Sequence, residues 1–373
     1  MRISIDTRGA KLYAGTGIGT YTRELMKNIM HMDKENQYLF FWPGEGYEQF
    51  SDMNNIEVQL VGTKNKTFWT YDYIPQQLKM KKTDLHHIPQ NGIGLPKDKW
   101  SKYVVTIHDL IPFLLPDTVG ESYKERFTEE MPSIVKNADA IITVSEYSKN
   151  DIIRFFGLDP DKIIVTHLAT DDIYKPMNHK RAQRFLESRY HISGDFILYL
   201  GGFSSRKNVT GLIHSYKRCI NKFSKHYDLV LVGAPKDAHD EIVHLIQTLK
   251  LSRYVKFTGF VPNEHLPFFY NAASLFVYPS LYEGFGLPPL EAMSCGCPTI
   301  TSNVSSIPEV VGDAALLIDP TNIEQLADAM AQILEDKVLA MNLIMKGLRK
   351  AASYSWEATA AKTLDVYKRL LHS

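Results

Sequence analysis

Two series of short β-rich runs, each interleaved with helical runs, constrain the fold of this chain more than any other feature. Short apolar runs that alternate with helical periodicity predict parallel strands joined by crossover helices. The expected strands of the first series are Arg2–Ile5, Tyr38–Phe41, Val58–Val61, Tyr103–Ile107 and Ala140–Val144. Those of the second series are Phe196–Leu200, Leu229–Val232, Val255–Phe257, Leu275–Tyr278 and Thr299–Thr301. The pattern therefore predicts two successive α/β domains.

The chain length fits that division, because 373 residues are enough for two domains of ordinary size. Between the two series, residues 168–193 are charged and have the composition of a linker. We expect an N-terminal domain over residues 1–170 and a C-terminal domain over residues 171–354. A last helix over residues 355–373 follows, with Ser355 placed to cap it.

Charge and composition exclude several classes of protein. Lys plus Arg and Asp plus Glu both number 42, so the formal net charge is zero, which argues against dedicated nucleic-acid binding. No apolar run reaches the length of a membrane-spanning helix, and the amino terminus lacks the apolar core of a signal peptide. Cys219, Cys295 and Cys297 do not have the spacing of a zinc site. We expect three reduced thiols in a cytoplasmic protein.

A glycine-rich run, Gly15–Gly19, follows the first expected strand and opens the helix after it. Glycines let a ligand approach the backbone, and the N–H groups at a helix start attract phosphate. A nicotinamide fingerprint fits poorly, because the spacing is GxGxG and the loop from Asp6 is long. A glycine-rich turn without a ligand is the alternative.

Two cations, Arg206 and Lys207, lie in the loop Gly201–Asn208, directly after the first strand of the second series. Open α/β sheets bind ligands at the carboxyl ends of their strands, and cations placed there suit a diphosphate. The alternative is a solvated basic loop.

The most specific motif is Glu283–Met293. Pro288 and Pro289 are tolerated in the first turn of a helix, so a short helix is expected to begin near them. Glu283 then lies in the loop before the helix and Glu291 in its first turns. Backbone N–H groups at the helix start would face an anion, and the two acids would hold sugar and ribose hydroxyls. Two exposed glutamates beside a proline-rich turn are the alternative.

His108 follows the expected strand Tyr103–Ile107, at the sheet edge where ligands collect. A histidine there can hydrogen-bond a substrate hydroxyl or orient a reacting group. A purely structural histidine is the alternative. His86, His87 and His167 are also near strand ends, but their spacing to carboxylates does not indicate a metal site.

Together these motifs resemble family 4 of the retaining glycosyltransferases, and the similarity covers almost the whole chain. It is carried by the Glu-x7-Glu element that begins at Glu283, by the glycine run, and by residues 138–148, 306–312 and 355–357. Within the family, residues 105–112 and 205–208 are most similar to bacterial mannosyltransferases that build surface polysaccharides.

The resemblance implies the GT-B fold, an α/β fold in which two Rossmann-like domains have parallel sheets facing across a cleft. It implies that the last helix crosses back to the first domain. It also implies retaining transfer of a hexose from a nucleotide diphosphate sugar, with GDP-mannose favoured, to a hydroxyl of a glycan or lipid-linked acceptor. UDP-glucose or another NDP-hexose is the alternative donor. A nucleotide-sugar epimerase and a catalytically silent nucleotide-binding surface-assembly protein are the alternative functions.

The resemblance also implies roles for single residues. Arg206 and Lys207 would neutralise the departing diphosphate, Glu283 would bind the transferred sugar, and Glu291 the ribose. The expected catalytic set is His108, Arg206, Lys207 and Glu283. The further donor contacts would be Gly17, Gly19, Val261, Gly284, Phe285, Gly286 and Leu287. No Asp-x-Asp motif stands in a fitting position, so we expect neither a metal nor a cofactor besides the donor.

The chain departs from the pattern of the family at two places. Gly202 stands where many relatives carry Arg, and residues 167–170 differ from the Pro-Asn-Gly run common in the family.

A basic and aromatic segment, residues 64–82, has the composition of a peripheral contact with an anionic membrane surface that carries a lipid-linked acceptor. A solvated loop and helix with aromatic side chains in the core is the alternative.

Overall fold

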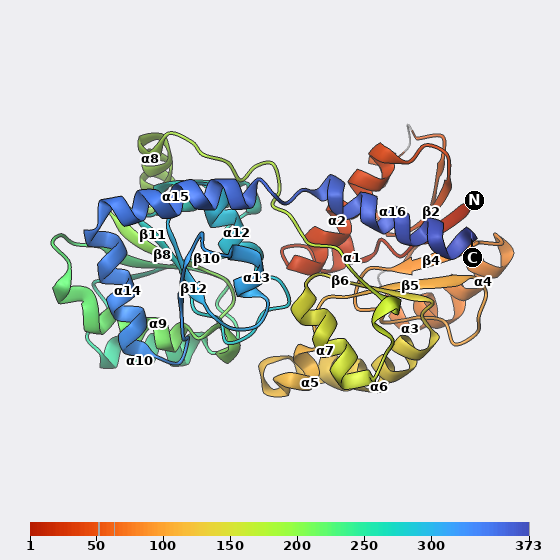
Figure 1. Ribbon diagram of the computed structural model, residues 1–373, viewed down its shortest axis with the longest axis horizontal. Coiled ribbons are helices and arrows are strands. Elements are labelled where there is room, and N and C mark those ends of the chain that lie inside the picture. The colour runs from red at the N-terminus through yellow and green to blue at the C-terminus, as the bar shows by residue number, and fades with distance from the viewer. Residues whose placement is uncertain (51–52, 63, 373) are drawn as a thin grey trace. The chain divides into compact units, whose positions relative to one another are not determined.

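A computed structural model describes residues 1–50, 53–62 and 64–372 of the chain. The chain divides into two compact units, each built around its own parallel sheet. The first unit comprises Met1–Leu168 and Ser355–Ser373, and the second comprises Ala169–Tyr354. Figure 1 shows helices on both faces of each sheet, which is how parallel sheets bury both of their apolar surfaces.

The first sheet has seven strands in the order β3-β2-β1-β4-β5-β6-β7, and all neighbouring pairs are parallel. Its strands are β1 (Arg2–Ile5), β2 (Gln37–Pro43), β3 (Ile56–Val61), β4 (Leu85–Ile88), β5 (Lys102–Ile107), β6 (Ala140–Thr143) and β7 (Ile163–Val165). All strands expected in the first series are confirmed, and β4 and β7 are additional. The strand order changes direction between β1 and β4, which makes their carboxyl ends a topological switch point.

Helices of the first unit connect these strands. They are α1 (Gly9–Leu12), α2 (Gly17–Met32), α3 (Lys66–Phe68), a π-helical turn (Trp69–Tyr73), α4 (Ile74–Met80), α5 (Ile111–Leu114), α6 (Glu121–Asn137), α7 (Glu146–Phe156) and α16 (Trp356–His372). The short 3₁₀ turns are Glu48–Phe50, Pro116–Thr118 and Pro160–Lys162.

The last helix, α16, begins where the sequence indicates, because the amide of Ala358 donates to Ser355 Oγ at 3.1 Å. The ring of Trp356 lies 6.3 Å from that of Tyr21 in α2, measured between ring centroids. The Tyr367 hydroxyl lies 2.6 Å from Nδ1 of His87 in β4. These buried contacts hold α16 within the first unit.

The second sheet has six strands in the order β10-β9-β8-β11-β12-β13, again with all neighbouring pairs parallel. Its strands are β8 (Phe196–Leu200), β9 (Asp228–Val232), β10 (Val255–Gly259), β11 (Leu275–Tyr278), β12 (Thr299–Ser302) and β13 (Leu316–Ile318). The strands expected in the second series are confirmed, and β13 is additional. Here the order changes direction between β8 and β11.

The helices of the second unit are α8 (His179–Tyr190), α9 (Val209–Cys219), α10 (His239–Thr248), α11 (Leu266–Ala272), α12 (Leu287–Ser294), α13 (Ile307–Val311), α14 (Ile323–Glu335) and α15 (Lys337–Ala351). The 3₁₀ turns are Ser205–Lys207, Ile220–Lys222 and Asn263–His265. The linker expected over residues 168–193 is wrong for much of its length, because it contains α8. Asn178 caps this helix, and its few apolar side chains, among them Ala182 and Leu186, are buried against the core.

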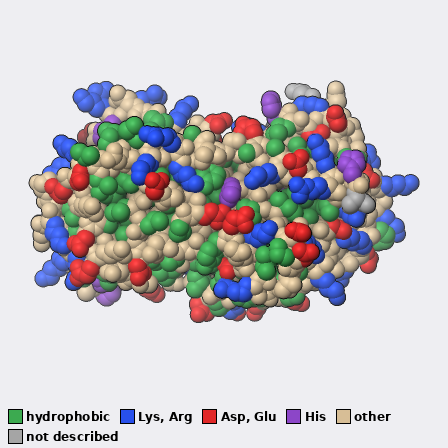
Figure 2. Space-filling model, in the orientation of Figure 1, with side chains coloured by type: hydrophobic (Ala, Val, Ile, Leu, Met, Phe, Trp, Pro, Cys, Tyr) green, Lys and Arg blue, Asp and Glu red, His purple; other side chains and the backbone are tan. Residues whose placement is uncertain are grey.

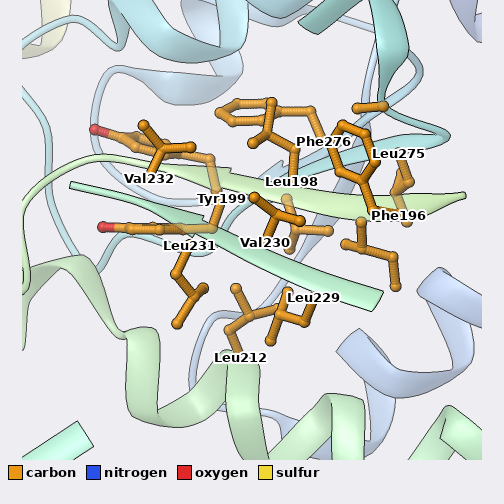
Figure 3. Packing of buried hydrophobic residues seen from close by; sticks show 14 of the residues in the cluster. Phe196, Leu198, Tyr199, Leu212, Leu229, Val230, Leu231, Val232, Leu275 and Phe276 are labelled. Atoms are coloured by element: carbon orange, nitrogen blue, oxygen red, sulfur yellow. The ribbon is translucent and has the colours of Figure 1, made fainter. Parts of the chain in front are cut away.

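The core of the second unit lies between its sheet and helices. Leu229 and Leu231 of β9 point to the same side of the sheet as Leu212 of α9, as the two-residue period of a strand requires (Figure 3). Phe276 of β11 and Leu198 of β8 belong to the same buried cluster. This packing fixes the strands whose carboxyl ends carry the candidate site.

The distribution of charged side chains is consistent with the zero net charge, and the cysteines are unpaired. Basic and acidic side chains are intermixed over the face that Figure 2 shows. Cys219, Cys295 and Cys297 are free and buried. Among the residues that the structure describes, no helix is both long enough and apolar enough to pass through a bilayer.

Candidate active site

The candidate site of the second unit lies at the carboxyl ends of β8 and β11, which are neighbouring strands. Arg206 and Lys207 belong to the short turn that follows β8, and Glu283 lies in the loop that follows β11. Because the strand order changes direction between β8 and β11, the side chains converge on the switch point of this sheet, where α/β proteins bind ligands.

Two cations meet one carboxylate there. Lys207 Nζ lies 2.7 Å and Arg206 Nη1 2.9 Å from Glu283 Oε1. The side chains of Arg206 and Lys207 are each 14% exposed, and that of Glu283 is 11% exposed. Burial by itself would raise the pKa of Glu283, but the two cations lower it to about 2. The carboxylate is therefore ionised at neutral pH, and within this trio cations outnumber acids.

Neutral hydroxyls complete the environment of Glu283. The Tyr278 hydroxyl donates to Glu283 Oε1 at 3.0 Å, and the Ser280 hydroxyl donates to the same oxygen at 2.5 Å. Lys207 Nζ also donates to the Tyr278 hydroxyl. Tyr278 and Ser280 were not predicted as site residues, although their place at the end of an expected strand was a signal for them.

Two serine side chains, Ser305 and Ser306, hydrogen-bond to the backbone of the loop from Glu283 to Leu287. Ser306 Oγ lies 2.8 Å from the carbonyl oxygen of Glu283 and 3.0 Å from that of Phe285. The amide of Glu283 donates to Ser305 Oγ at 3.0 Å. The side chains of Phe285 and Leu287 are buried, so this loop presents its backbone rather than these side chains.

Gly286 is required by both conformation and packing. Its φ is +108°, and a Cβ added there would lie 2.5 Å from Ile307 Cδ1. We expect Gly286→Ala to lower the free energy of unfolding by about 1–3 kcal/mol, because it combines a strained φ with a steric clash. Urea unfolding of the purified protein measures the change.

Gly194→Ala is the matched control for that prediction. Gly194 also has a positive φ, +81°, but nothing lies within 4 Å of an added Cβ. The control therefore isolates the backbone strain from the clash. Equal losses in both variants would contradict the packing role assigned to Gly286.

Glu291 lies inside α12 and has a different electrostatic setting. Its Oε2 accepts a hydrogen bond from the Tyr270 hydroxyl at 2.8 Å. Burial raises the pKa of Glu291 to about 7, although hydrogen bonds from Tyr270 and Tyr174 favour the charged form. At neutral pH this carboxyl can both donate and accept hydrogen bonds, which suits it to vicinal hydroxyls.

Val261, the expected base contact, follows β10 and is buried. The ring beside it in the sequence, Phe260, is 72% exposed. The exposed side chain at this point is therefore that of Phe260 and not that of Val261.

His108 belongs to the first unit and follows β5. Its Nε2 lies 2.8 Å from the carbonyl oxygen of Pro89, and its amide donates to Asn91 Oδ1 at 2.8 Å. Burial lowers the pKa of His108 to about 4, so the ring is neutral at physiological pH. Because a carbonyl oxygen only accepts, the proton lies on Nε2 and Nδ1 is the hydrogen-bond acceptor.

Gly17 and Gly19 also belong to the first unit, at the start of α2. Thr16 caps the helix, and its Oγ1 accepts a hydrogen bond from the amide of Gly19 at 3.3 Å. A Cβ added to Gly19 would lie 2.1 Å from the carbonyl oxygen of Tyr13. The close packing of this turn therefore requires Gly19 independently of any ligand.

Comparison with known proteins identifies the chain. Residues 15–172 match Glycosyltransferase Family 4, and residues 191–350 match Glycosyl transferases group 1. The O-antigen chain mannosyltransferase B of Escherichia coli is 31% identical to this chain, over 99% of the chain and 100% of that protein. The chain belongs to glycosyltransferase family 4. It is therefore a sugar-transferring enzyme, as expected.

Solved structures show the fold of this glycosyltransferase. Sucrose-phosphate synthase from Thermosynechococcus elongatus superposes with a TM-score of 0.76 at 21% identity, over 100% of this chain and 99% of that one. Anabaena HepE, solved in complex with UDP and glucose, gives a TM-score of 0.77 at 18% identity, over 99% and 100% of the two chains. The expected GT-B fold, with its two parallel-sheet domains, is confirmed.

Within residues 1–50, 53–62 and 64–372, no group of three His, Cys, Asp or Glu side chains is arranged to hold a metal ion. The cations near Glu283 come from Arg206 and Lys207.

Proposed function

We propose that this glycosyltransferase moves a mannosyl residue from GDP-mannose to a hydroxyl of a glycan or lipid-linked acceptor, with retention of anomeric configuration. The observation that carries the proposal is the cluster of Arg206, Lys207 and Glu283 at the switch point between β8 and β11. The two cations suit a diphosphate, and the ionised carboxylate of Glu283 can accept hydrogen bonds from sugar hydroxyls. The choice of mannose rests on relatives named as mannosyltransferases, among them the Escherichia coli protein described above.

In the proposed mechanism the bond from the sugar C1 to the donor phosphate oxygen breaks, and a bond from C1 to the acceptor oxygen forms on the same face. The acceptor's proton passes to the departing phosphate oxygen. Negative charge grows on the diphosphate during this step, and Arg206 and Lys207 stabilise it. A single such donor in a preorganised site is worth about 3–4 kcal/mol of barrier. Glu283 accepts hydrogen bonds from the transferred sugar.

The remaining donor contacts are proposed by position. The backbone of residues 284–287 lines the sugar and phosphates, Glu291 binds the ribose hydroxyls, and Val261 lies at the base. In the first unit, Gly17 and Gly19 are assigned to the donor phosphate, and neutral His108 accepts a hydrogen bond through Nδ1 from a substrate hydroxyl.

We also propose that transfer needs no metal ion, because two side-chain cations already lie where the diphosphate charge would develop. Excess EDTA, followed by gel filtration, should leave the rate of GDP release from GDP-mannose within about twofold of the untreated enzyme. Loss of activity that Mg²⁺ or Mn²⁺ restores would contradict this.

A thermal-shift screen with GDP, UDP and ADP tests the base preference. A ligand that binds only the folded protein adds about 2.7 kcal/mol of stability at one hundred times its dissociation constant. We expect GDP to give the largest upward shift of Tm. A larger shift with UDP would indicate a UDP-hexose as the donor in place of GDP-mannose. A separate incubation of the enzyme with the donor alone tests the epimerase alternative, which conversion of the donor into its epimer would favour.

The lipid-linked acceptor implies contact with a membrane surface through residues 64–82. Phe68, Tyr71 and Met80 of this segment are exposed, at 42%, 37% and 70%. Its basic side chains also have internal partners, because Lys81 pairs with Glu57 at 2.6 Å and Lys79 lies over the ring of Trp100. Flotation with anionic and with neutral vesicles tests the contact. Binding only to the anionic vesicles is the expected result, and equal recovery in both would contradict it.

A further inference from the structure

Four donor groups approach the same oxygen atom of the Glu283 carboxylate. Lys207 Nζ and Arg206 Nη1 pair with Oε1 at 2.7 and 2.9 Å. The hydroxyls of Tyr278 and Ser280 donate to this atom at 3.0 and 2.5 Å. A carboxylate oxygen has about two lone-pair sites, so these donors fully engage Oε1. A sugar hydroxyl that binds this carboxylate must therefore use the other oxygen, Oε2.

The Tyr278 hydroxyl lies between the cation and the acid of this cluster. It accepts a hydrogen bond from Lys207 Nζ and donates its own proton to Glu283 Oε1. Burial and the negative charge of Glu283 raise the pKa of Tyr278 well above its ordinary value, so the hydroxyl keeps this proton. The side chain is only 1% exposed, so Tyr278 contacts two groups of the candidate site without reaching the solvent side.

Packing fixes the position of the Tyr278 ring. The ring stacks with those of Tyr199 and Phe276, at centroid distances of 6.3 and 6.0 Å and interplanar angles of 18° and 20°. In the neighbouring strand, Thr301 Oγ1 donates to the carbonyl oxygen of Tyr278 at 2.8 Å. Close-packed side chains of this kind have little freedom to change rotamer, so the hydroxyl is a fixed point beside the two charged groups.

A bound diphosphate would change the interactions of Glu283. Its negative charge competes with the carboxylate for Arg206 and Lys207, because both are donors that form strong hydrogen bonds to phosphate. The hydroxyls of Tyr278 and Ser280 are neutral, so the diphosphate attracts them far less. They are therefore the donors that stay on Oε1 when a nucleotide sugar occupies the site.

We propose that Tyr278 is a positioning residue, whose hydroxyl holds Oε1 of Glu283, with support from Ser280, so that Oε2 faces the transferred sugar. This role rests on the proposed function, because it assumes that the sugar binds Glu283. Tyr278 touches neither the sugar nor the diphosphate. Loss of its hydroxyl should therefore weaken the binding of the hexose and leave the binding of the nucleotide intact.

Calorimetric titration of the wild type and of Tyr278→Phe with GDP and with GDP-mannose tests the proposal. Phenylalanine keeps the stacked ring and its contact with Lys207 Nζ, which lies 4.9 Å from the ring centroid, so only the hydroxyl is lost. GDP should bind the two proteins within about twofold. GDP-mannose should bind Tyr278→Phe about tenfold more weakly, the size of one hydrogen bond to a charged group, and kcat should fall by at least as much.

Tyr216→Phe is the matched control. Tyr216 is a buried tyrosine of α9, and its hydroxyl donates to the carbonyl oxygen of Tyr227 at 2.6 Å. This variant also loses one buried hydroxyl, but outside the cluster around Glu283, so both dissociation constants and kcat should stay as in the wild type. Ser280→Ala removes another donor to Oε1. It should weaken GDP-mannose binding selectively, and it replaces Tyr278→Phe if that variant fails to fold.

The ratio of the two dissociation constants separates this inference from the proposed function. An unchanged ratio in Tyr278→Phe, or an equal loss for GDP and GDP-mannose, would overturn the positioning role and leave the donor site standing. Tighter binding of UDP and UDP-glucose to the wild type would count against GDP-mannose as the donor, and the same ratio measured with that pair would then test Tyr278. Binding of neither pair to the wild type would overturn both proposals.

Discussion

Lys207→Ala is expected to lower kcat by about 10²–10³-fold while the enzyme stays folded. The loss arises because the ammonium group lies 2.7 Å from Glu283, at the position proposed for the diphosphate, where negative charge grows as the donor bond breaks. The fold should persist because Arg206 Nη1, at 2.9 Å, still pairs with Glu283, so the buried carboxylate is not left alone. Steady-state kinetics with GDP-mannose, together with circular dichroism, measure both effects.

Lys222→Ala is the matched control for this prediction. Lys222 lies in the same unit and pairs with Asp328 at 2.9 Å, but both side chains are at least half exposed. Removing an exposed pair of this kind should change stability by less than about 1 kcal/mol and leave kcat unchanged. Near-normal transfer by Lys207→Ala, or an equal loss in both variants, would remove Lys207 from the proposed catalytic set.

The first unit is expected to lose stability steeply as the pH falls below 6.5. His86, His87 and His108 are buried, and burial lowers their pKa values to about 4, 3 and 4 from the ordinary 6.5. Below pH 6.5 the unfolded chain therefore binds protons that the folded chain does not bind, so stability decreases as the pH falls toward the folded pKa values. Between about pH 7.5 and pH 5 each such histidine lowers the free energy of unfolding by about 2 kcal/mol.

Tryptophan fluorescence isolates this effect, because all four tryptophans of the chain, Trp42, Trp69, Trp100 and Trp356, belong to the first unit. Urea unfolding is followed at both pH values in the wild type and in His87→Gln. Glutamine can keep hydrogen bonds to Tyr367 and Thr106, the present partners of His87, but does not titrate. The loss of stability on acidification should be about 2 kcal/mol smaller in this variant.

His31→Gln is the control, because His31 is exposed near the end of α2. Its unfolding should depend on pH as that of the wild type does. The same pH dependence in the wild type and in His87→Gln would mean that His87 is not held neutral by its burial.

Much of the fold could be predicted from the sequence because apolar runs with β-branched residues mark the central strands. Arg2–Ile5, Phe196–Leu200 and Leu275–Tyr278 were predicted with their observed ends. The strand β4 was missed because His86 and His87 interrupt its apolar pattern. Their partners, among them Ser4 and Tyr367, come from distant parts of the chain and cannot be seen in a local window.

The short edge strands β7 and β13 escaped for another reason. Each has three residues and pairs on one side only, with too little length for a two-residue period to be recognised. The helix α8 was taken for a linker because its surface is strongly charged and only a narrow stripe, including Ala182 and Leu186, is buried.

The charged residues of the candidate site were predicted from the sequence, but the neighbouring hydroxyl groups that hydrogen-bond to them were not. Spacing indicated Arg206, Lys207 and Glu283, because each follows a strand whose place in the sheet is set by the α/β pattern. The hydroxyls around Glu283 depend on which strands become neighbours, and the raised pKa of Glu291 depends on burial beside Tyr270.

The most direct test of the donor site follows GDP-mannose by ¹H NMR, with octyl α-mannoside as the acceptor probe. The wild type should release GDP and form a new mannoside with the anomeric configuration of the donor. Lys207→Ala should do so at least about one hundredfold more slowly. Equal rates in the two enzymes, or a product with inverted configuration, would contradict a retaining transfer that depends on the Arg206–Lys207–Glu283 cluster.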